Sequence, residues 1–288
     1  MKSLKSGFIP YIFLIPAGII LIVFFIYPLL EIFRLSFTEY HIVSPPQFNG
    51  LKNYIKILSD QTFWITLKNS IIYLVGVVPP LVIFPLIIAI LVNNKLKGIS
   101  FFRAIFYLPV IISMVVVGIA WKWLYAENGV LNYLCKVLFL TKEPIGWLTD
   151  PKIAIFSVMA VTVWKGLGYY MVIYLAGLQT IPEELYESGY IDGTNSIQKH
   201  IYITIPLLIP SISLVTIVSS ISALKVFTEI FVMTGGGPIN SSSTLVYYLY
   251  QEAFENLNLG YASAIGVVLF FMILIFSIIN LRFFEKGH

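Results

Sequence analysis

The sequence predicts an all-α integral membrane protein with about six transmembrane helices. Hydrophobic residues make up 58% of the 288-residue chain and charged residues only 11%, and the mean hydropathy is +0.89. Soluble domains average about 45–50% apolar and about 25% charged residues. Because a helix needs about 20 apolar residues to cross a bilayer, a chain of this length accommodates about six spans with modest loops.

Six apolar stretches supply the predicted spans, at residues 8–33, 64–92, 104–124, 153–178, 206–233 and 259–283. The second contains Pro79, Pro80 and Pro85. We expect it to kink or break there, because proline lacks the N–H that a helix interior uses. The first stretch is longer than the apolar core of a signal peptide, about 7–15 residues, so we expect it to remain as a span.

The formal net charge of +4 is mild. We interpret it as membrane topology rather than nucleic-acid binding, because lysine and arginine in short loops mark the cytoplasmic side. One side carries Lys2, Lys5, Lys95, Lys97, Arg103, Lys199, Arg282 and Lys286. The other carries Arg34, Lys52, Lys56, Lys122, Lys136, Lys142 and Lys152 over longer loops. The totals are nearly equal, but the density predicts cytoplasmic N- and C-termini.

The segment 180–206 is the most informative part of the chain. It is a polar stretch between two apolar spans, and its pattern predicts two helices joined by a turn outside the membrane. Thr180 and Glu183 have capping-box spacing, and Pro182 suits a first helical turn. Asp192-Gly193 supplies turn chemistry, and Thr194 or Asn195 can cap the second helix.

No catalytic or metal-ligating set is predicted. Cys135 is the single cysteine, and the three histidines at 41, 200 and 288 have no ligand spacing. No G-x-x-x-x-G-K-[ST] motif occurs. If transport uses ATP, another chain must hydrolyse it, so we expect neither a cofactor nor a metal in this chain.

Segment 180–206 resembles the EAA loop of permease subunits in binding-protein-dependent ABC importers. That motif has Glu-Ala-Ala, three residues, glycine, nine residues and Ile-x-Leu-Pro, and Glu187, Gly193, Ile203 and Pro206 stand at this spacing. Two departures occur: Ser188 and Gly189 replace the alanines, and Ile205 replaces leucine. These exchanges are small-for-small and apolar-for-apolar, although Gly189 lowers helix stability by up to ~1 kcal/mol relative to alanine.

Further segments resemble the sugar-importing, MalF-like branch of this family. They are residues 93–109 before the third span, 164–182 at the end of the fourth, and Thr234–Pro238 with Ser243-Thr244 before the last. The resemblance implies a MetI-like bundle in a prokaryotic cell membrane that moves a sugar or related solute by alternating access. It also implies a second related permease in a heterodimer, two ATPase subunits that bind ATP-Mg, and an extracytoplasmic solute-binding protein.

The resemblance implies that the residues coupling this chain to the ATPase are Glu187, Ser188, Gly189, Asp192, Gly193 and Pro206. Glu187 would make a charge-assisted contact with a basic ATPase residue, although a solvated helix acid remains an alternative. Gly193 would let the turn approach the partner closely. For Asp192 we favour a turn-stabilising role over partner contact.

Polar and aromatic groups at mid-membrane depth mark solute pathways, because exposing them to lipid costs energy. The candidates are Trp164, Lys165, Gly166, Tyr169, Ser219 and Lys225, with Tyr170, Ser220, Ser222 and Glu229 nearby. The alternatives are helix packing for the small residues, an interfacial belt for the tyrosines, and an i,i+4 ion pair between Lys225 and Glu229.

An ion-coupled secondary transporter of a small polar solute is the alternative function. It would be expected to carry acids deep in its spans and broken helices in an inverted repeat. Only Glu229 qualifies as such an acid, and no repeat is evident. A membrane enzyme would need a convergent set of titratable residues, and the sequence shows none.

Overall fold

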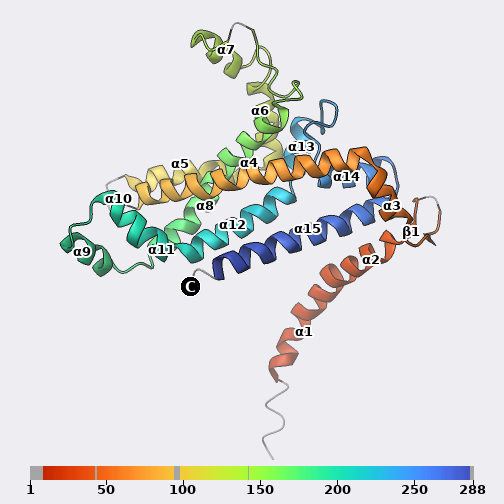
Figure 1. Ribbon diagram of the computed structural model, residues 1–288, viewed down its shortest axis with the longest axis horizontal. Coiled ribbons are helices and arrows are strands. Elements are labelled where there is room, and N and C mark those ends of the chain that lie inside the picture. Colours follow the sequence, from red (N-terminus) through yellow and green to blue (C-terminus); the bar gives the residue numbers. More distant parts are fainter. Residues whose placement is uncertain (1–8, 43, 94–97, 142, 286–288) are drawn as a thin grey trace, which may run out of the picture. The chain divides into compact units, whose positions relative to one another are not determined.

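The computed structural model describes residues 9–42, 44–93, 98–141 and 143–285, and its regular structure is almost entirely helical (Figure 1). Six lysines used to predict orientation lie outside the described residues: Lys2, Lys5, Lys95, Lys97, Lys142 and Lys286. The chain forms two compact units. Of the described residues, one unit contains those up to Asp60 together with Leu249–Phe271, and the other contains those from Gln61 to Tyr248 and from Met272 onward.

The first unit is a helical arm with a small hairpin. Its elements are α1 (Ile9–Leu21), the π-helical turn η1 (Ile22–Ile26), α2 (Tyr27–Ser36), β1 (Thr38–Glu39), β2 (Gln47–Phe48), α3 (Lys52–Ser59), η3 (Gln251–Glu255) and the first part of α15 (Leu259–Glu285). The Asn53 amide donates hydrogen bonds to the carbonyl oxygens of Ser36 and Thr38, at 2.9 and 2.8 Å. The Tyr261 hydroxyl donates to the Asp60 carboxylate at 2.5 Å. These buried bonds fix the loops at the helix ends, because buried polar groups require partners.

The second unit is the helix bundle that carries the sites described below. Its elements are α4 (Gln61–Val92), α5 (Ile99–Ile111), α6 (Met114–Leu124), α7 (Val130–Val137), α8 (Ala154–Leu178), α9 (Glu183–Ile191), α10 (Ser196–Lys199), η2 (His200–Thr204), α11 (Ile205–Leu207), α12 (Ile209–Leu224), α13 (Thr228–Met233), α14 (Leu245–Tyr250) and the rest of α15. Helices α8 and α12 both pack against α4.

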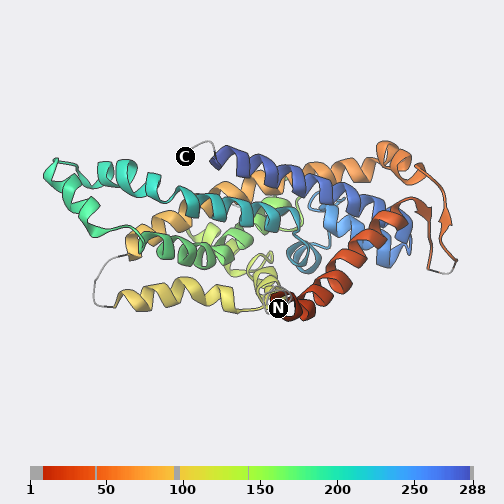
Figure 2. The ribbon, with the colours of Figure 1, turned by 90° about the horizontal axis from the view of Figure 1, so that it is seen from below.

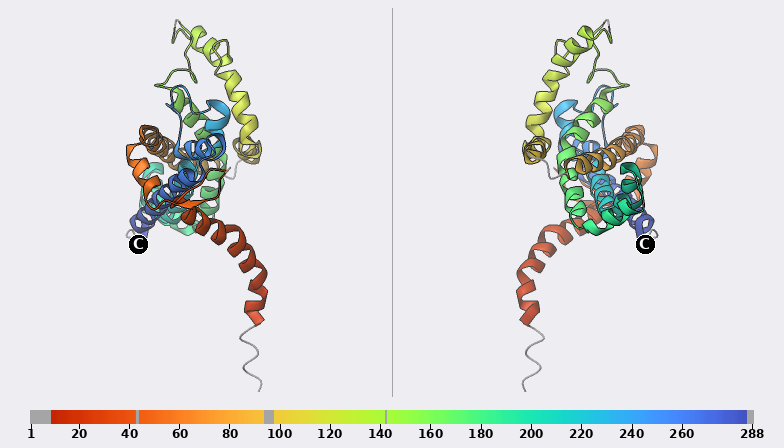
Figure 3. Two further views of the ribbon diagram at one scale, coloured as in Figure 1. Left: turned by 90° about the vertical axis from the view of Figure 1, so that its right-hand side faces the viewer. Right: turned by 90° about the vertical axis from the view of Figure 1, so that its left-hand side faces the viewer.

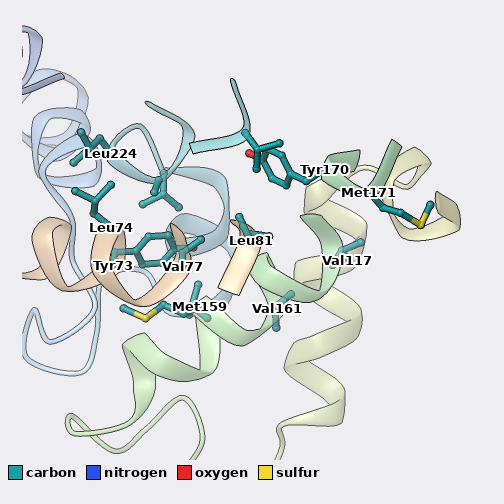
Figure 4. Close-up of a cluster of buried hydrophobic side chains, with 14 of the residues drawn as sticks. Tyr73, Leu74, Val77, Leu81, Val117, Met159, Val161, Tyr170, Met171 and Leu224 are labelled. Atoms are coloured by element: carbon teal, nitrogen blue, oxygen red, sulfur yellow. The ribbon is translucent and has the colours of Figure 1, made fainter. Parts of the chain in front are cut away.

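Large apolar side chains fill the space between α4, α8 and α12 (Figure 4). Tyr73 and Val77 from α4 lie beside Met159 and Val161 from α8, and all four are buried. The Tyr73 hydroxyl is 2.6 Å from the Thr162 hydroxyl. The Thr162 hydroxyl also donates to the Val158 carbonyl oxygen, at 3.3 Å. Both hydroxyls therefore have partners at a buried helix interface, where an unpaired hydroxyl would cost free energy.

Four of the six predicted spans are single helices long and apolar enough to cross a membrane. They are Phe13–Ser36, Gln61–Val92, Ala154–Leu178 and Leu259–Phe284. The expected break in the second span does not occur, because α4 continues through Pro79, Pro80 and Pro85. Packing of α4 on α8 and α12 holds the helix together across the missing N–H groups.

The other two predicted spans are broken helices. In place of one helix over 104–124, α5 and α6 meet at a bend of 96°, with Ile112 in extended conformation between them. The predicted span 206–233 is interrupted at Leu208, where Ser196–Leu207 and Ile209–Leu224 differ by 68°, and again between α12 and α13. Apolar composition predicts membrane burial, but it does not show where a helix changes direction.

Candidate functional site

Helices α9 and α10 form the hairpin predicted over residues 180–206. Figures 1 and 2 both place it beyond the ends of α8 and α12, so it projects from the bundle. The predicted turn at Asp192-Gly193 is confirmed: Asp192 is the C-cap of α9, and Gly193 has a φ of +81°. This left-handed conformation favours glycine, because a side chain there meets the backbone.

The second arm of the hairpin begins with a capping box, as predicted for Asn195. The Asn195 carboxamide oxygen accepts from the Gln198 N–H at 2.8 Å, and the Gln198 side chain accepts from the Asn195 N–H at 2.9 Å. The predicted capping box of the first arm is wrong. Pro182 is the N-cap of α9, and the Thr180 hydroxyl donates to the Gly177 carbonyl oxygen at 2.8 Å. Thr180 therefore closes the end of α8.

Gly189 joins the two arms of the hairpin. It is buried, and a Cβ there would lie 2.7 Å from Ile203 Cδ1 and 3.2 Å from the Thr194 hydroxyl oxygen. The Thr194 hydroxyl also donates to the Gly189 carbonyl oxygen at 2.7 Å. Neighbouring Ser188 is exposed and donates its hydroxyl to the Glu184 carbonyl oxygen. Gly189 thus allows close contact between the arms, which offsets its low helix propensity.

Glu187 is exposed on the hairpin between two hollows. One, of about 720 Å³, includes in its lining the ionisable residues Arg103, Glu183, Glu187, Lys199 and His200. The other, of about 660 Å³, runs along the hairpin past Tyr190 and Ile191. These two side chains are 82% and 84% exposed. The hairpin therefore presents an acid beside apolar groups that no described residue covers.

Asp192 and Gly193 are exposed at the turn and line neither hollow. Pro206 lies within the short helix α11, and the change of direction comes at Leu208, two residues later. Pro210 occupies the first turn of α12, where its missing N–H has no intrahelical role. The hairpin thus ends slightly beyond the predicted residue.

A cavity of about 270 Å³ lies within the bundle and contains four of the six predicted pathway residues. Lys165, Gly166 and Tyr169 come from α8, and Ser219 comes from α12. Ser219 is fully buried, whereas Tyr169 is 44% exposed. The remaining two predicted residues, Trp164 and Lys225, do not line this cavity.

The structure explains why these two lie elsewhere. The ring of Trp164 packs edge-on against Trp121, with centroids 5.4 Å apart. Lys225 is exposed at the C-cap of α12, and α13 starts only at Thr228. Lys225 and Glu229 therefore do not share a helix, and the predicted i,i+4 ion pair is not formed. An ion pair does join Arg34 to Glu31, three residues apart on α2.

Two of the cavity-lining residues, Gly166 and Lys165, also make contacts between packed helices. A Cβ at Gly166 would lie 2.7 Å from Leu81 Cδ2, so this glycine provides space for α4. The Lys165 ammonium donates to the carbonyl oxygens of Pro109 and Val110, at 3.0 and 3.2 Å. The packing alternative considered for small residues therefore describes Gly166 well, even though the residue lines the cavity.

The cavity also contains residues that the sequence did not single out, or named only as neighbours. They are Val77, Leu81, Val110, Thr162, Tyr170, Val218, Ser222, Ala223 and Glu229. Thr162 stands four residues before Gly166, and Ser222 three residues after Ser219, so helical spacing places each on a lining face. The contribution of α4 carries no such signal, because Val77 and Leu81 are ordinary apolar span residues. No group of three or more His, Cys, Asp or Glu able to hold a metal occurs in the described part of the chain.

Comparison with known proteins identifies the family. A family model described as the inner membrane component of binding-protein-dependent transport systems matches residues 66–286. The probable ABC transporter permease YurN of Bacillus subtilis is 37% identical, with 98% of each chain covered. The lactose transport permease LacF of Rhizobium radiobacter is 35% identical over 94% of this chain and 92% of its own. The arabinooligosaccharide transport permease AraP of Bacillus subtilis is 34% identical over 95% and 87%.

Solved structures agree in fold. A bacterial ABC transporter involved in alginate import gives a TM-score of 0.86 at 22% identity, covering 99% of this chain and 98% of the other. The alginate transporter in complex with an alginate-pentasaccharide-bound periplasmic protein gives 0.82 at 21% identity, over 99% and 94%. These matches give no support to an ion-coupled transporter. The chain belongs to the family of inner membrane components of binding-protein-dependent transport systems, the membrane permeases of ABC transporters.

Proposed function

We propose that this chain is the permease subunit of an ATP-driven importer that moves a sugar or related solute into the cytoplasm by alternating access. One observation supports this proposal: a single unit of a binding-protein-dependent permease contains both of the features that ATP-coupled solute transport requires. These are an exposed hairpin containing Glu187 and a cavity inside the bundle whose lining includes hydroxyl and charged side chains. A sugar is supported by the relatives named for lactose and arabinooligosaccharides.

The cavity chemistry suits a neutral polyhydroxy solute. Its lining includes the hydroxyl residues Thr162, Ser219 and Ser222, and the ring of Tyr169 meets that of Tyr170 edge-on at 5.0 Å. Hydroxyls bind sugar oxygens, and aromatic faces pack against the apolar face of a pyranose. Lys165 and Glu229 contribute one formal charge of each sign, so the lining favours no net solute charge.

The partners in this proposal follow from the family. A second, related permease completes a heterodimer, two separate ATPases bind ATP-Mg, and an extracytoplasmic protein delivers the solute. The hairpin and both termini lie in the cytoplasm. Each ATPase takes one hairpin into a surface cleft, where Glu187 meets a basic residue and Tyr190 and Ile191 become buried. Closure of the ATPases then moves the hairpins and rocks the spans.

ATPase activity in proteoliposomes tests the proposal. The complex contains this chain, its partner permease and the ATPase, with and without the binding protein and a panel of sugars. We expect one loaded binding protein to stimulate hydrolysis, and both Glu187→Ala and Gly193→Pro to abolish the stimulation. If no ATPase copurifies and a proton or sodium gradient drives uptake instead, the importer proposal is wrong.

A further inference from the structure

The break between α5 and α6 leaves backbone groups without helical partners inside a membrane span. The two helices differ in direction by 96° (Figure 3), and Ile112 has φ −75° and ψ 136°. The last four carbonyl groups of a helix have no intrahelical N–H donor. Lipid offers no replacement, so broken spans persist only where neighbouring groups satisfy the backbone.

Lys165 of α8 supplies this replacement. Its Nζ atom donates to the carbonyl oxygens of Pro109 and Val110, both in the last turn of α5, at 3.0 and 3.2 Å. The C-terminal end of a helix carries partial negative charge, which a cation stabilises. An ammonium has three N–H donors, so two of them serve the helix end and one is left for the cavity that Lys165 lines.

The two halves of the broken span are attached to different helices. A Cβ at Gly168 of α8 would lie 2.1 Å from the Phe106 carbonyl oxygen, so backbone contacts backbone where α5 meets α8. A Cβ at Gly118 of α6 would lie 2.9 Å from Val232 Cγ1 of α13. The third span therefore links α8 to α13, and Lys165 acts on α5 within one turn of the junction.

We propose that Lys165 is a positioning residue that holds the end of α5 against α8 and so sets the angle at the α5–α6 break. This role replaces solute contact as the principal function of the residue. The proposal rests on the proposed function only for its effect on transport. Loss of the ammonium frees the end of α5, spreads the α5–α6 angle over several values, and weakens the link between α8 and α13 during transport.

The direct test is a distance between the two half-helices, measured by pulsed electron spin resonance on the full complex in nanodiscs. Nitroxides are attached at Phe102→Cys on α5 and Trp123→Cys on α6, whose native side chains are 55% and 75% exposed. Cys135→Ser removes the one native cysteine, and the partners are made cysteine-free. The variants are Lys165→Met, Lys165→Arg and, as a matched control, Lys122→Met, which removes an exposed lysine from α6.

We expect Lys165→Met to broaden or shift the distance distribution, with the wild-type conformer reduced about ten-fold or more, as loss of charge-assisted hydrogen bonds implies. Lys165→Arg should restore the wild-type distribution, and Lys122→Met should leave it unchanged. In transport assays, Lys165→Met should lower the maximal rate while leaving the KM for solute near its wild-type value.

An unchanged distance distribution in Lys165→Met overturns the proposal, and a raised solute KM alongside it would identify Lys165 as a solute ligand. If the methionine variant does not assemble, Lys165→Gln decides the question. A shifted distance in this variant supports the proposal, and a wild-type distance contradicts it. The distance is measured without ATP or solute, so it stands even if the proposed transport activity is not found.

Discussion

The α9–α10 hairpin and the bundle cavity are both polar sites within one helical unit, but they are constructed in opposite ways. The hairpin lies within one continuous segment, and local bonds hold its shape: the capping box of Asn195, the turn at Gly193 and the bond from Thr194 to Gly189. The cavity takes its lining from α4, α5, α8, α12 and α13. One site is encoded by spacing along the chain, whereas the other exists only once the helices have packed.

The hairpin and the cavity also differ in how far their side chains are exposed. Tyr190 and Ile191 of the hairpin are more than four-fifths exposed, while Ser219 of the cavity is fully buried. An exposed apolar pair beside a carboxylate is typical of a surface that a partner covers. Ser219 belongs to the lining of a cavity inside the bundle, and its hydroxyl donates to the Thr216 carbonyl oxygen of its own helix. Changes in the hairpin should therefore affect coupling, and changes in the cavity should affect solute recognition or the packing of the bundle.

The largest expected effect comes from breaking the hairpin turn. Gly193→Pro requires a φ of about −65° in place of +81°, and it removes the N–H that donates to the Tyr190 carbonyl oxygen. We expect a cost of about 3 kcal/mol or more to the hairpin, with loss of binding-protein-stimulated ATPase activity. Gly193→Asn is the matched control, because asparagine tolerates the left-handed region. Equal loss in both variants would show that the conformation of the turn is not the cause.

The second-largest effect is expected from a substitution that disturbs the packing of α5 against α8. Gly168→Ala places a Cβ 2.1 Å from the Phe106 carbonyl oxygen, a backbone atom that cannot rotate away. We expect destabilisation of about 1–3 kcal/mol, seen as a lower thermal midpoint and a lower yield of monodisperse complex. Gly18→Ala should have little effect, because nothing lies within 4 Å of its added Cβ. A wild-type midpoint for Gly168→Ala would contradict the close α5–α8 contact.

The third prediction concerns solute recognition. Tyr169→Ala removes a partly exposed ring from the cavity, and we expect the KM for solute to rise about ten-fold, which corresponds to about 1.4 kcal/mol. ATPase activity in the absence of solute should change little, since the hairpin is untouched. Phe156→Ala removes another partly exposed ring from α8, 55% exposed against 44% for Tyr169, that lies outside the cavity and serves as the control. Uptake of every sugar at the wild-type KM would remove Tyr169 from the pathway.

The fourth prediction, with a smaller expected effect, compares two buried tyrosines of the bundle. Tyr73→Phe removes one of the two partners of the Thr162 hydroxyl, which keeps its bond to the Val158 carbonyl oxygen, whereas Tyr174→Phe removes a buried hydroxyl that has no hydrogen-bond partner. We expect the first to cost about 0.5–1.5 kcal/mol and the second to be neutral or stabilising. Thermal unfolding of the two purified complexes measures the difference. The reverse order would mean that the Tyr73–Thr162 bond does not stabilise the bundle.

The smallest effect is expected for Gly189→Ala, which places in the hairpin the alanine of the family motif. A Cβ at Gly189 meets the tip of Ile203, a flexible atom that can move aside. Gly189→Ala also gains up to about 1 kcal/mol of helix propensity, so we expect stability and coupled ATPase activity near wild type. Gly189→Leu should separate the two arms and reduce coupling. Full activity of the leucine variant would show that close contact between the arms is not required.

The sequence predicted the two sites to different extents. The turn at Gly193 and the cap at Asn195 were predicted, because each depends on neighbours a few residues away, whereas the change of direction at the end of the hairpin comes at Leu208 rather than at Pro206. The capping box at Thr180 was wrong, since a hydroxyl at the start of the hairpin can equally well close the preceding helix, as it does at Gly177. In the cavity, the lining residues of α8 and α12 were partly predicted, because polar groups in apolar spans stand out. The contribution of α4 left no trace in its composition.

Composition and spacing alone determined that this chain is a helical membrane protein, that most of its spans lie where apolar runs occur, and that one hairpin resembles a family motif. These properties depend on hydrophobicity and on contacts within a few residues, which the order of amino acids fixes directly. Tertiary structure decided that α4 runs through its prolines, that the third and fifth spans bend, and that Lys165 bonds the end of α5. Each of these depends on which helices become neighbours, and packing sets that over long separations in sequence.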